Sequence, residues 1–177
     1  MDVFRILVLC LAMSTDTAIA EPNERAGRYM EVDAYLANSF AEIEPRANTL
    51  WVAGELRDSV ERALGHRLAA LRVRYWRDDD TSVWILDEIG KELPITIGVT
   101  VREGKISNVR VLEFRESRGW EVRYPFFTDQ FYDVKLDSKG HLNRKIDKIT
   151  GATLSVAAVT RIAKVALILD EYTRTKG

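Results

Sequence analysis

Apolar residues recur at every second position at 71–75 and again at 95–101, and this period limits the possible folds more than any other feature. Side chains alternate between the two faces of a β-strand, so the pattern predicts strands with one buried face. We expect strands at about 71–75, 82–89, 94–101 and 106–114, with turns at 78–80 and at Glu103 and Gly104. The segment 115–119 is expected to leave the sheet, so the pattern predicts antiparallel hairpins.

Helical spacing replaces this period near the C-terminus. A helix is expected from residue 153 or 154 to about 172, with a buried stripe formed by Val156, Val159, Ile162, Ala163, Ala166, Leu167 and Leu169. Two more helices are expected at 26–43 and 54–70. Together these elements predict an α+β fold, an antiparallel sheet with N-terminal helices and a long C-terminal helix. Residues 21–70 form an N-terminal helical extension, and residues 71–177 form the main domain. Three tryptophans are expected to fill the core: Trp51, Trp76 and Trp84.

Residues 1–20 have the three-part pattern of a secretory signal peptide. Arg5 precedes an unbroken apolar run at 6–13, and Ala18 and Ala20 form a small-x-small cleavage site before Glu21. The run is too short to span a bilayer, which needs about 20 residues. The alternative is a buried N-terminal helix. We expect an exported protein whose mature chain has no membrane span.

Composition excludes several kinds of site. Cys10 is the only cysteine, so cleavage after Ala20 leaves no thiolate for a disulfide, a zinc site, an iron–sulfur cluster or a c-type haem. Any redox cofactor must therefore be organic. The formal net charge of −1 provides no basic field for nucleic acid. His66 and His141 lack a ligand pattern, so neither a metal site nor a catalytic residue is expected.

The segment 147–155 carries the clearest chemical signal. A Thr150-Gly151-Ala152 turn leads into the final helix, and small residues let backbone N–H groups approach an anion closely. A helix N-terminus adds unpaired N–H donors and a partial positive charge, which together can bind a phosphate. A plain helix cap at Thr150 or Thr153 is the alternative.

Five fixed positions of this segment, followed by Ser155, resemble the D-x-x-S/T-G-A-T-x-S/T motif of the FMN-binding domain family, which includes the G and C subunits of Rnf and sodium-pumping quinone reductase complexes. The resemblance implies that Thr153 carries FMN as a phosphoester. It also implies the surrounding contacts: Thr150, Gly151, Ala152, Leu154 and Ser155 belong to the phosphate turn, and Asp147 serves recognition or activation of the threonine.

A second segment supports the resemblance, which covers roughly residues 84–172. Glu116, Ser117 and Gly119 match the family's E-S/T-x-G loop and are implied to lie near the isoalloxazine ring or the ribityl chain. Trp120 either stacks on the ring or packs between loop and core. The aromatic segment 124–127 either shields the flavin, docks a partner or is buried.

The implied function is that of a periplasmic electron carrier with covalent FMN. A periplasmic flavin transferase would attach the flavin from FAD with magnesium, and membrane or periplasmic redox proteins would exchange electrons with it. Two alternatives remain open. One is a flavin reductase subunit that acts on a small acceptor, and the other is a non-redox binding or assembly module.

Overall fold

The expected strands form the centre of one larger antiparallel sheet. The computed structural model describes residues 26–40 and 45–176 of the 177. The sheet has six strands in the order β1-β6-β5-β4-β3-β2. The strands are β1 (Gly27–Arg28), β2 (Arg46–Trp51), β3 (Arg72–Asp78), β4 (Thr81–Ile89), β5 (Pro94–Arg102) and β6 (Lys105–Phe114). The helices are α1 (Val32–Phe40), α2 (Gly54–Leu64), η1 (Trp120–Arg123), α3 (Pro125–Thr128), η2 (Asp129–Phe131) and α4 (Thr153–Lys176).

Turn chemistry fixes the central hairpins. Glu103 and Gly104 both have positive φ, 51° and 74°, which is the backbone of the two-residue turn that matches the twist of paired strands. β5 then pairs with β6 from Arg102↔Lys105 to Ile95↔Phe114. On its other side β5 pairs with β4 along the full length of both strands. The hairpin expected from the sequence is therefore confirmed.

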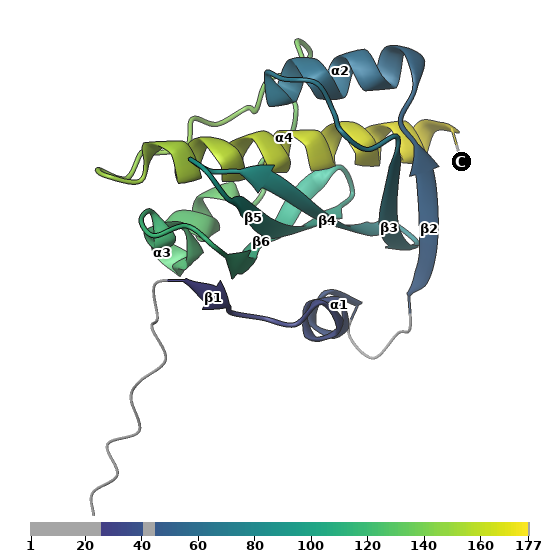
Figure 1. Ribbon diagram of the computed structural model, residues 1–177. Coiled ribbons are helices and arrows are strands. Elements are labelled where there is room, and N and C mark those ends of the chain that lie inside the picture. Colours follow the sequence, from purple (N-terminus) through teal and green to yellow (C-terminus); the bar gives the residue numbers. More distant parts are fainter. Residues whose placement is uncertain (1–25, 41–44, 177) are drawn as a thin grey trace, which may run out of the picture.

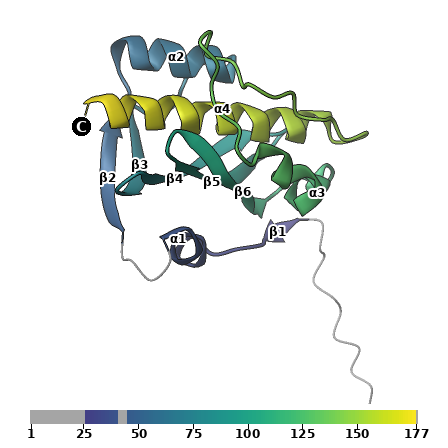
Figure 2. The same ribbon diagram turned by 180° about the vertical axis from the view of Figure 1, so that it is seen from behind.

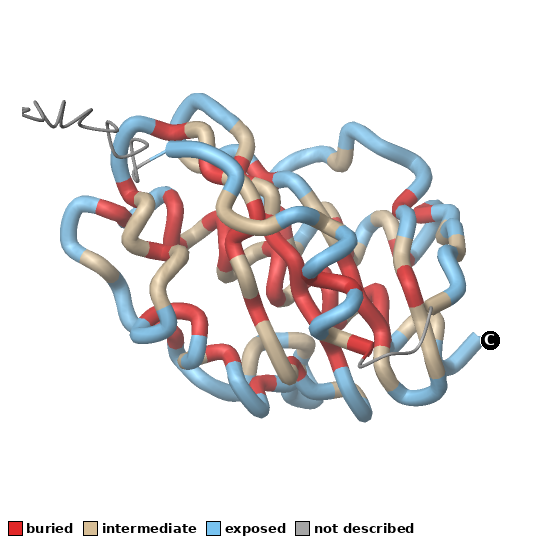
Figure 3. The backbone as a smooth tube through the Cα atoms, turned by 90° about the horizontal axis from the view of Figure 1, so that it is seen from below, coloured by how far each residue is buried: buried red, intermediate tan, exposed pale blue. Residues whose placement is uncertain are grey.

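The two faces of the sheet carry different helices (Figures 1 and 2). α4 crosses one face of the sheet, with α2 beside it. The connection from η2 to α4 passes along the other side of α4. The main core lies between α4 and the central strands, where Ile95, Ile97, Val99 and Val101 of β5 are fully buried. α1 covers the opposite face through a smaller cluster around Tyr35 and Phe40. Buried residues concentrate in the central strands accordingly (Figure 3).

The N-terminal extension contains two strands that the sequence did not predict. β2 pairs with β3 and β1 pairs with β6, so the extension supplies both edges of the sheet. β2 escaped prediction because none of its side chains is fully buried, which leaves no apolar alternation to detect. Trp51 lies in this edge strand and is 63% exposed, so the expectation that it fills the core is wrong. Trp76 and Trp84 are buried as expected.

Both N-terminal helices are shorter than expected. α1 covers only Val32–Phe40 of the predicted 26–43, of which 41–43 lie outside the described residues. α2 ends at Leu64 rather than 70, because Gly65 adopts φ 79° and caps the helix through a bond from its N–H to the Glu61 carbonyl. The predicted signal peptide, 1–20, also lies outside the described residues. Among residues 26–40 and 45–176, no helix is long and apolar enough to cross a membrane.

Candidate functional site

The first turn of α4 has backbone donors that no bond within the helix uses. Thr153 is the first residue of α4, and the Val156 N–H donates to the Ala152 carbonyl at 2.9 Å. The N–H groups of Thr153, Leu154 and Ser155 precede that bond and have no acceptor within the helix. These donors and the helix dipole favour an anion at this end of α4.

The same turn is open on its outer side. Gly151 has φ 83°, and a side chain added there would meet no atom within 4 Å. Thr150, Thr153 and Leu154 are exposed, whereas Ala152 and Ser155 are buried. A phosphate can therefore reach the backbone without displacing a side chain, and the Thr153 side chain lies at the protein surface.

Gly119 brings the second matching segment against this turn. Its φ is 88°, and an added Cβ would collide with Ser155 Oγ and lie 3.1 Å from Ser155 Cβ and 3.6 Å from Ala152 Cα. The loop after β6 and the first turn of α4 therefore meet, although 35 positions separate them in the sequence. The two segments that carry the resemblance therefore lie against each other.

Replacing Gly119 with Ala is expected to destabilise the protein by about 2–4 kcal/mol, because strain at positive φ adds to the collision with Ser155. Gly140 is a matched control, since its φ is 73° but an added Cβ meets nothing within 4 Å. Gly140→Ala should cost only about 1 kcal/mol. Chemical denaturation of both variants measures the difference. Equal losses would show that close packing on Ser155 contributes nothing.

Glu116 holds a neighbouring loop in place. Its side chain is buried, and Oε1 accepts backbone N–H bonds from Lys91 (2.6 Å), Glu92 (2.6 Å) and Leu93 (2.8 Å). Burial alone would raise the pKa of Glu116, but the three N–H donors and the Lys91 charge together lower it below its ordinary value. The structure therefore uses Glu116 Oε1 to fix the turn between β4 and β5. The turn's three amides were not identified from the sequence, where Gly90 and Pro94 were the local signs of a bend.

Glu116→Gln is expected to cost about 1–3 kcal/mol at neutral pH, because three charge-assisted bonds become neutral ones. A carboxyl whose pKa is depressed by folding stabilises fully above its unfolded value of about 4.3 and loses this contribution as pH falls through the folded value. The gap in unfolding free energy between wild type and variant should therefore shrink below about pH 4. Glu92→Gln, an exposed partner of Lys91, is the control and should show little effect. A gap that stays constant with pH would contradict an ionised Glu116.

The other residues predicted for the site differ in their exposure and in their contacts. The Asp147 N–H donates to Gln130 Oε1 at 2.7 Å, which ties the start of the motif to η2, and both Asp147 and Ser117 are exposed. Trp120 is half-buried, 5.9 Å from Tyr124 in an edge-to-face arrangement, and the Arg123 guanidinium lies 5.5 Å from its ring. Stacking of Trp120 on a flavin stays a prediction.

The aromatic segment 124–127 divides between core and surface. Phe127 is fully buried and packs edge-to-face on Phe131, with ring centres 5.5 Å apart. Phe126 is 61% exposed and stacks on Tyr124. Burial, the default expectation, therefore holds for Phe127 but not for Phe126.

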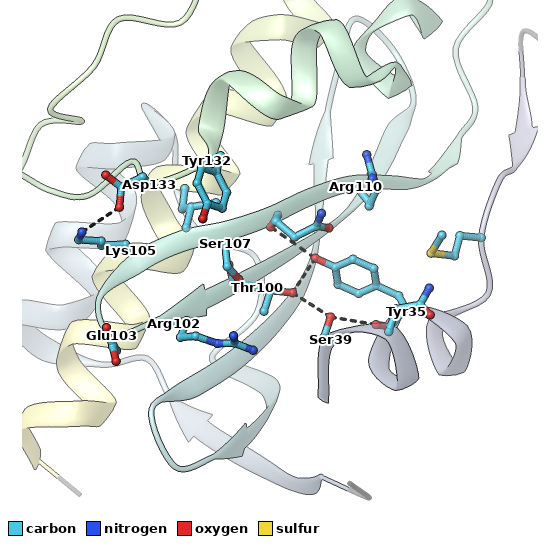
Figure 4. Close-up of a pocket in the computed structure, with 14 residues that line it drawn as sticks. Tyr35, Ser39, Thr100, Arg102, Glu103, Lys105, Ser107, Arg110, Tyr132 and Asp133 are labelled. Carbon is cyan, nitrogen blue, oxygen red and sulfur yellow. Dashed lines mark hydrogen bonds and ion pairs between the residues drawn. The ribbon is translucent and has the colours of Figure 1, made fainter. Parts of the chain in front are cut away.

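A polar cavity of about 570 Å³ lies on the other face of the sheet, between α1, β5, β6 and the two residues after η2, Tyr132 and Asp133 (Figure 4). The Tyr35 hydroxyl and Thr100 Oγ1 are 2.9 Å apart, and burial raises the pKa of Tyr35. Lys105 forms an ion pair with Asp133 at 2.8 Å. No residue of the 147–155 motif lines this cavity. The cavity is therefore separate from the site predicted from the motif.

The fold places an open turn with free backbone N–H donors at the start of the last helix. The sequence profile described as FMN-binding domain matches residues 90–168, which include both segments of the site. Searches of curated proteins and of solved structures each gave no match. The chain therefore contains a domain of the FMN-binding domain family and is a flavin-binding protein.

The residues present fit the phosphate end of FMN. Free helix-terminal N–H groups, an unobstructed Gly151 and the exposed Thr153 suit an anionic ester better than a metal ion. No group of three or more His, Cys, Asp and Glu side chains within 26–40 and 45–176 could hold a metal.

Proposed function

We propose that this chain is an exported electron-transfer flavoprotein whose FMN is joined by a phosphoester to Thr153. The single observation that carries the proposal is the position of Thr153. It is exposed, it begins α4, and it stands among backbone donors that no helical bond uses. The matching family profile supports FMN as the cofactor.

Attachment needs a nucleophile and a stabilised phosphate. The Thr153 oxygen would attack the FMN phosphorus of FAD, the pyrophosphate bond would break, AMP would leave, and the threonine proton would be lost. A flavin transferase with magnesium would supply the base and the metal. This chain would contribute the presented hydroxyl and the N–H groups that bind the ester oxygens. Bound FMN supplies the redox chemistry, and the protein orients it and tunes its potential.

Export is proposed from the pattern of residues 1–20, and the periplasm is the compartment in which a periplasmic flavin transferase would act. The test is co-expression with such a transferase, followed by intact mass and N-terminal sequencing of the periplasmic fraction. A chain that begins at Glu21 and has gained one FMN less one water is expected. A chain recovered from the periplasm without any flavin would contradict the proposal. Yellow colour lost on denaturation would mean that the flavin is bound but not covalent.

Electron transfer is tested separately from attachment. An electron carrier should be reduced and reoxidised by partner redox proteins and should show no sustained turnover of a small acceptor by itself. Turnover with a small acceptor and a chemical donor, in the absence of any partner protein, would instead identify a reductase subunit.

A further inference from the structure

A second cavity, of about 560 Å³, lies on the α4 face of the sheet and is distinct from the motif. It is bounded by α2, the 66–70 loop, β3, β4 and α4. Its walls are mainly apolar: Val60, Leu64, Val73, Leu86, Ile162 and Val165. Clefts of 300–1,000 Å³ with apolar walls and a few converging polar groups are typical of small-molecule sites.

The cavity exists because two neighbouring strands separate. β3 and β4 pair only from Tyr75↔Trp84 to Asp78↔Thr81. Beyond that point β3 continues along β2 as far as Arg72, while β4 continues along β5 as far as Ile89. The separated ends of β3 and β4 are therefore not paired with each other, and they line the cavity. Backbone polar groups are therefore available beside an apolar floor.

Strand alternation decides which charges face this cavity. Leu86 and Glu88 point to the α4 face, whereas the Asp87 carboxylate points to the other face and accepts a bond from Thr96 Oγ1. The Arg74 guanidinium likewise lies over the Trp76 ring, in the cluster under α1. Of the charged groups of β3 and β4 that line the cavity, the Glu88 carboxylate alone is left on the α4 face.

Basic groups outnumber that carboxylate. Arg161 donates to Glu88 Oε1 from Nε at 3.0 Å and from Nη2 at 2.7 Å, which neutralises the buried charge. His66 Nε2 lies 3.0 Å from the same oxygen. Arg67 adds a further cation beside His66 on the cavity wall. Because Arg161 balances Glu88, the Arg67 guanidinium leaves the polar end of the cavity with a net positive charge, while the body of the cavity is apolar.

We propose that this cavity binds a small amphipathic anion, with its apolar part between α2, α4 and the separated strands and its anionic group beside Arg67 and His66. This proposal does not depend on flavin at Thr153. It concerns a separate surface formed by α2 and by the 66–70 loop, which lie outside the matched segment 90–168.

Two probes with the same aromatic body test the proposal on the full chain. Anilinonaphthalene sulfonate is anionic, and N-phenylnaphthylamine lacks the sulfonate. Wild type should bind both, with the anionic probe bound more tightly. Arg67→Glu should raise the Kd of the anionic probe about fivefold or more and leave that of the neutral probe within about twofold. Arg62→Glu, on α2 but outside the cavity wall, is the charge-matched control and should change neither.

Blocking variants test the location. Val165→Phe, which fills the cavity from α4, and Ala69→Trp, at its exposed rim, should each abolish binding of both probes. Ala69 is exposed, so its variant disturbs no buried side chain and remains informative if the Val165 variant fails to fold. Absence of binding to wild type, equal effects of the variants at 67 and 62, or unaffected binding in a folded blocking variant would each overturn the proposal. Displacement of the probe by loading with FMN would assign the cavity to the flavin and overturn it as well.

Discussion

Thr153→Ala is expected to abolish covalent flavin completely while leaving the fold intact. The substitution removes the one hydroxyl at the first position of α4. Ser155 cannot replace it, because that side chain is buried against Gly119. Thr153 is exposed, so its loss should change the unfolding free energy by about 0.5 kcal/mol or less.

Intact mass after co-expression with a flavin transferase measures this outcome directly. Wild type should gain one FMN less one water, and the variant should gain nothing. Thr175→Ala, in the exposed last turn of the same helix, is the control and should be flavinylated fully. Peptide mapping that finds FMN on Thr150 or Ser155 of the variant would contradict the assignment of Thr153.

The contrast between these residues explains how far sequence alone could define the site. The turn at 150–153 is local, so residue types and spacing were sufficient to predict its open backbone and its position before a helix. The role of Glu116 could not be predicted, because its three partners at 91–93 lie more than 20 residues away. The resemblance implies that Glu116 lies near the ring or the ribityl chain, which stays a prediction; the structure adds that Oε1 holds a backbone turn.

The same distinction applies to the fold. β4, β5 and β6 were predictable because each has a buried face and their turns have characteristic residues. β1 has two exposed residues and is defined only by its pairing with β6, so no local pattern could identify it. At Gly98 the information that the sequence lacks is the contact with α1. A glycine inside a strand is expected to weaken it, but an added Cβ here would lie 2.8 Å from Cζ of Tyr35, so the packing of α1 requires glycine.

A buried charge in the last helix was also invisible in the sequence. Asp170 follows the apolar stripe of α4 and is 1% exposed. Its Oδ1 accepts bonds from Arg77 Nη2 at 2.6 Å and from Ser82 Oγ at 2.7 Å. Ser82 Oγ in turn accepts a bond from the indole N–H of Trp84 at 2.9 Å. This chain of bonds connects the end of α4 to β3 and β4.

Asp170→Ala is expected to destabilise the protein by about 3–5 kcal/mol, because it removes the buried carboxylate that pairs with the Arg77 charge and accepts from the Ser82 hydroxyl. For a chain of this size, 3 kcal/mol corresponds to a fall in Tm of roughly 6–12 °C. Glu171→Ala, at the adjacent exposed position, is the control and should change stability by about 0.5 kcal/mol or less.

A double-mutant cycle with Arg77→Met separates the ion pair from lost packing. Arg77 is 19% exposed at its side chain, so its charge is only partly solvated once Asp170 is gone. The double variant should therefore be more stable than the sum of the two single losses predicts, by about 1–3 kcal/mol. Additive losses would mean that the Arg77–Asp170 pair contributes nothing beyond the separate side chains.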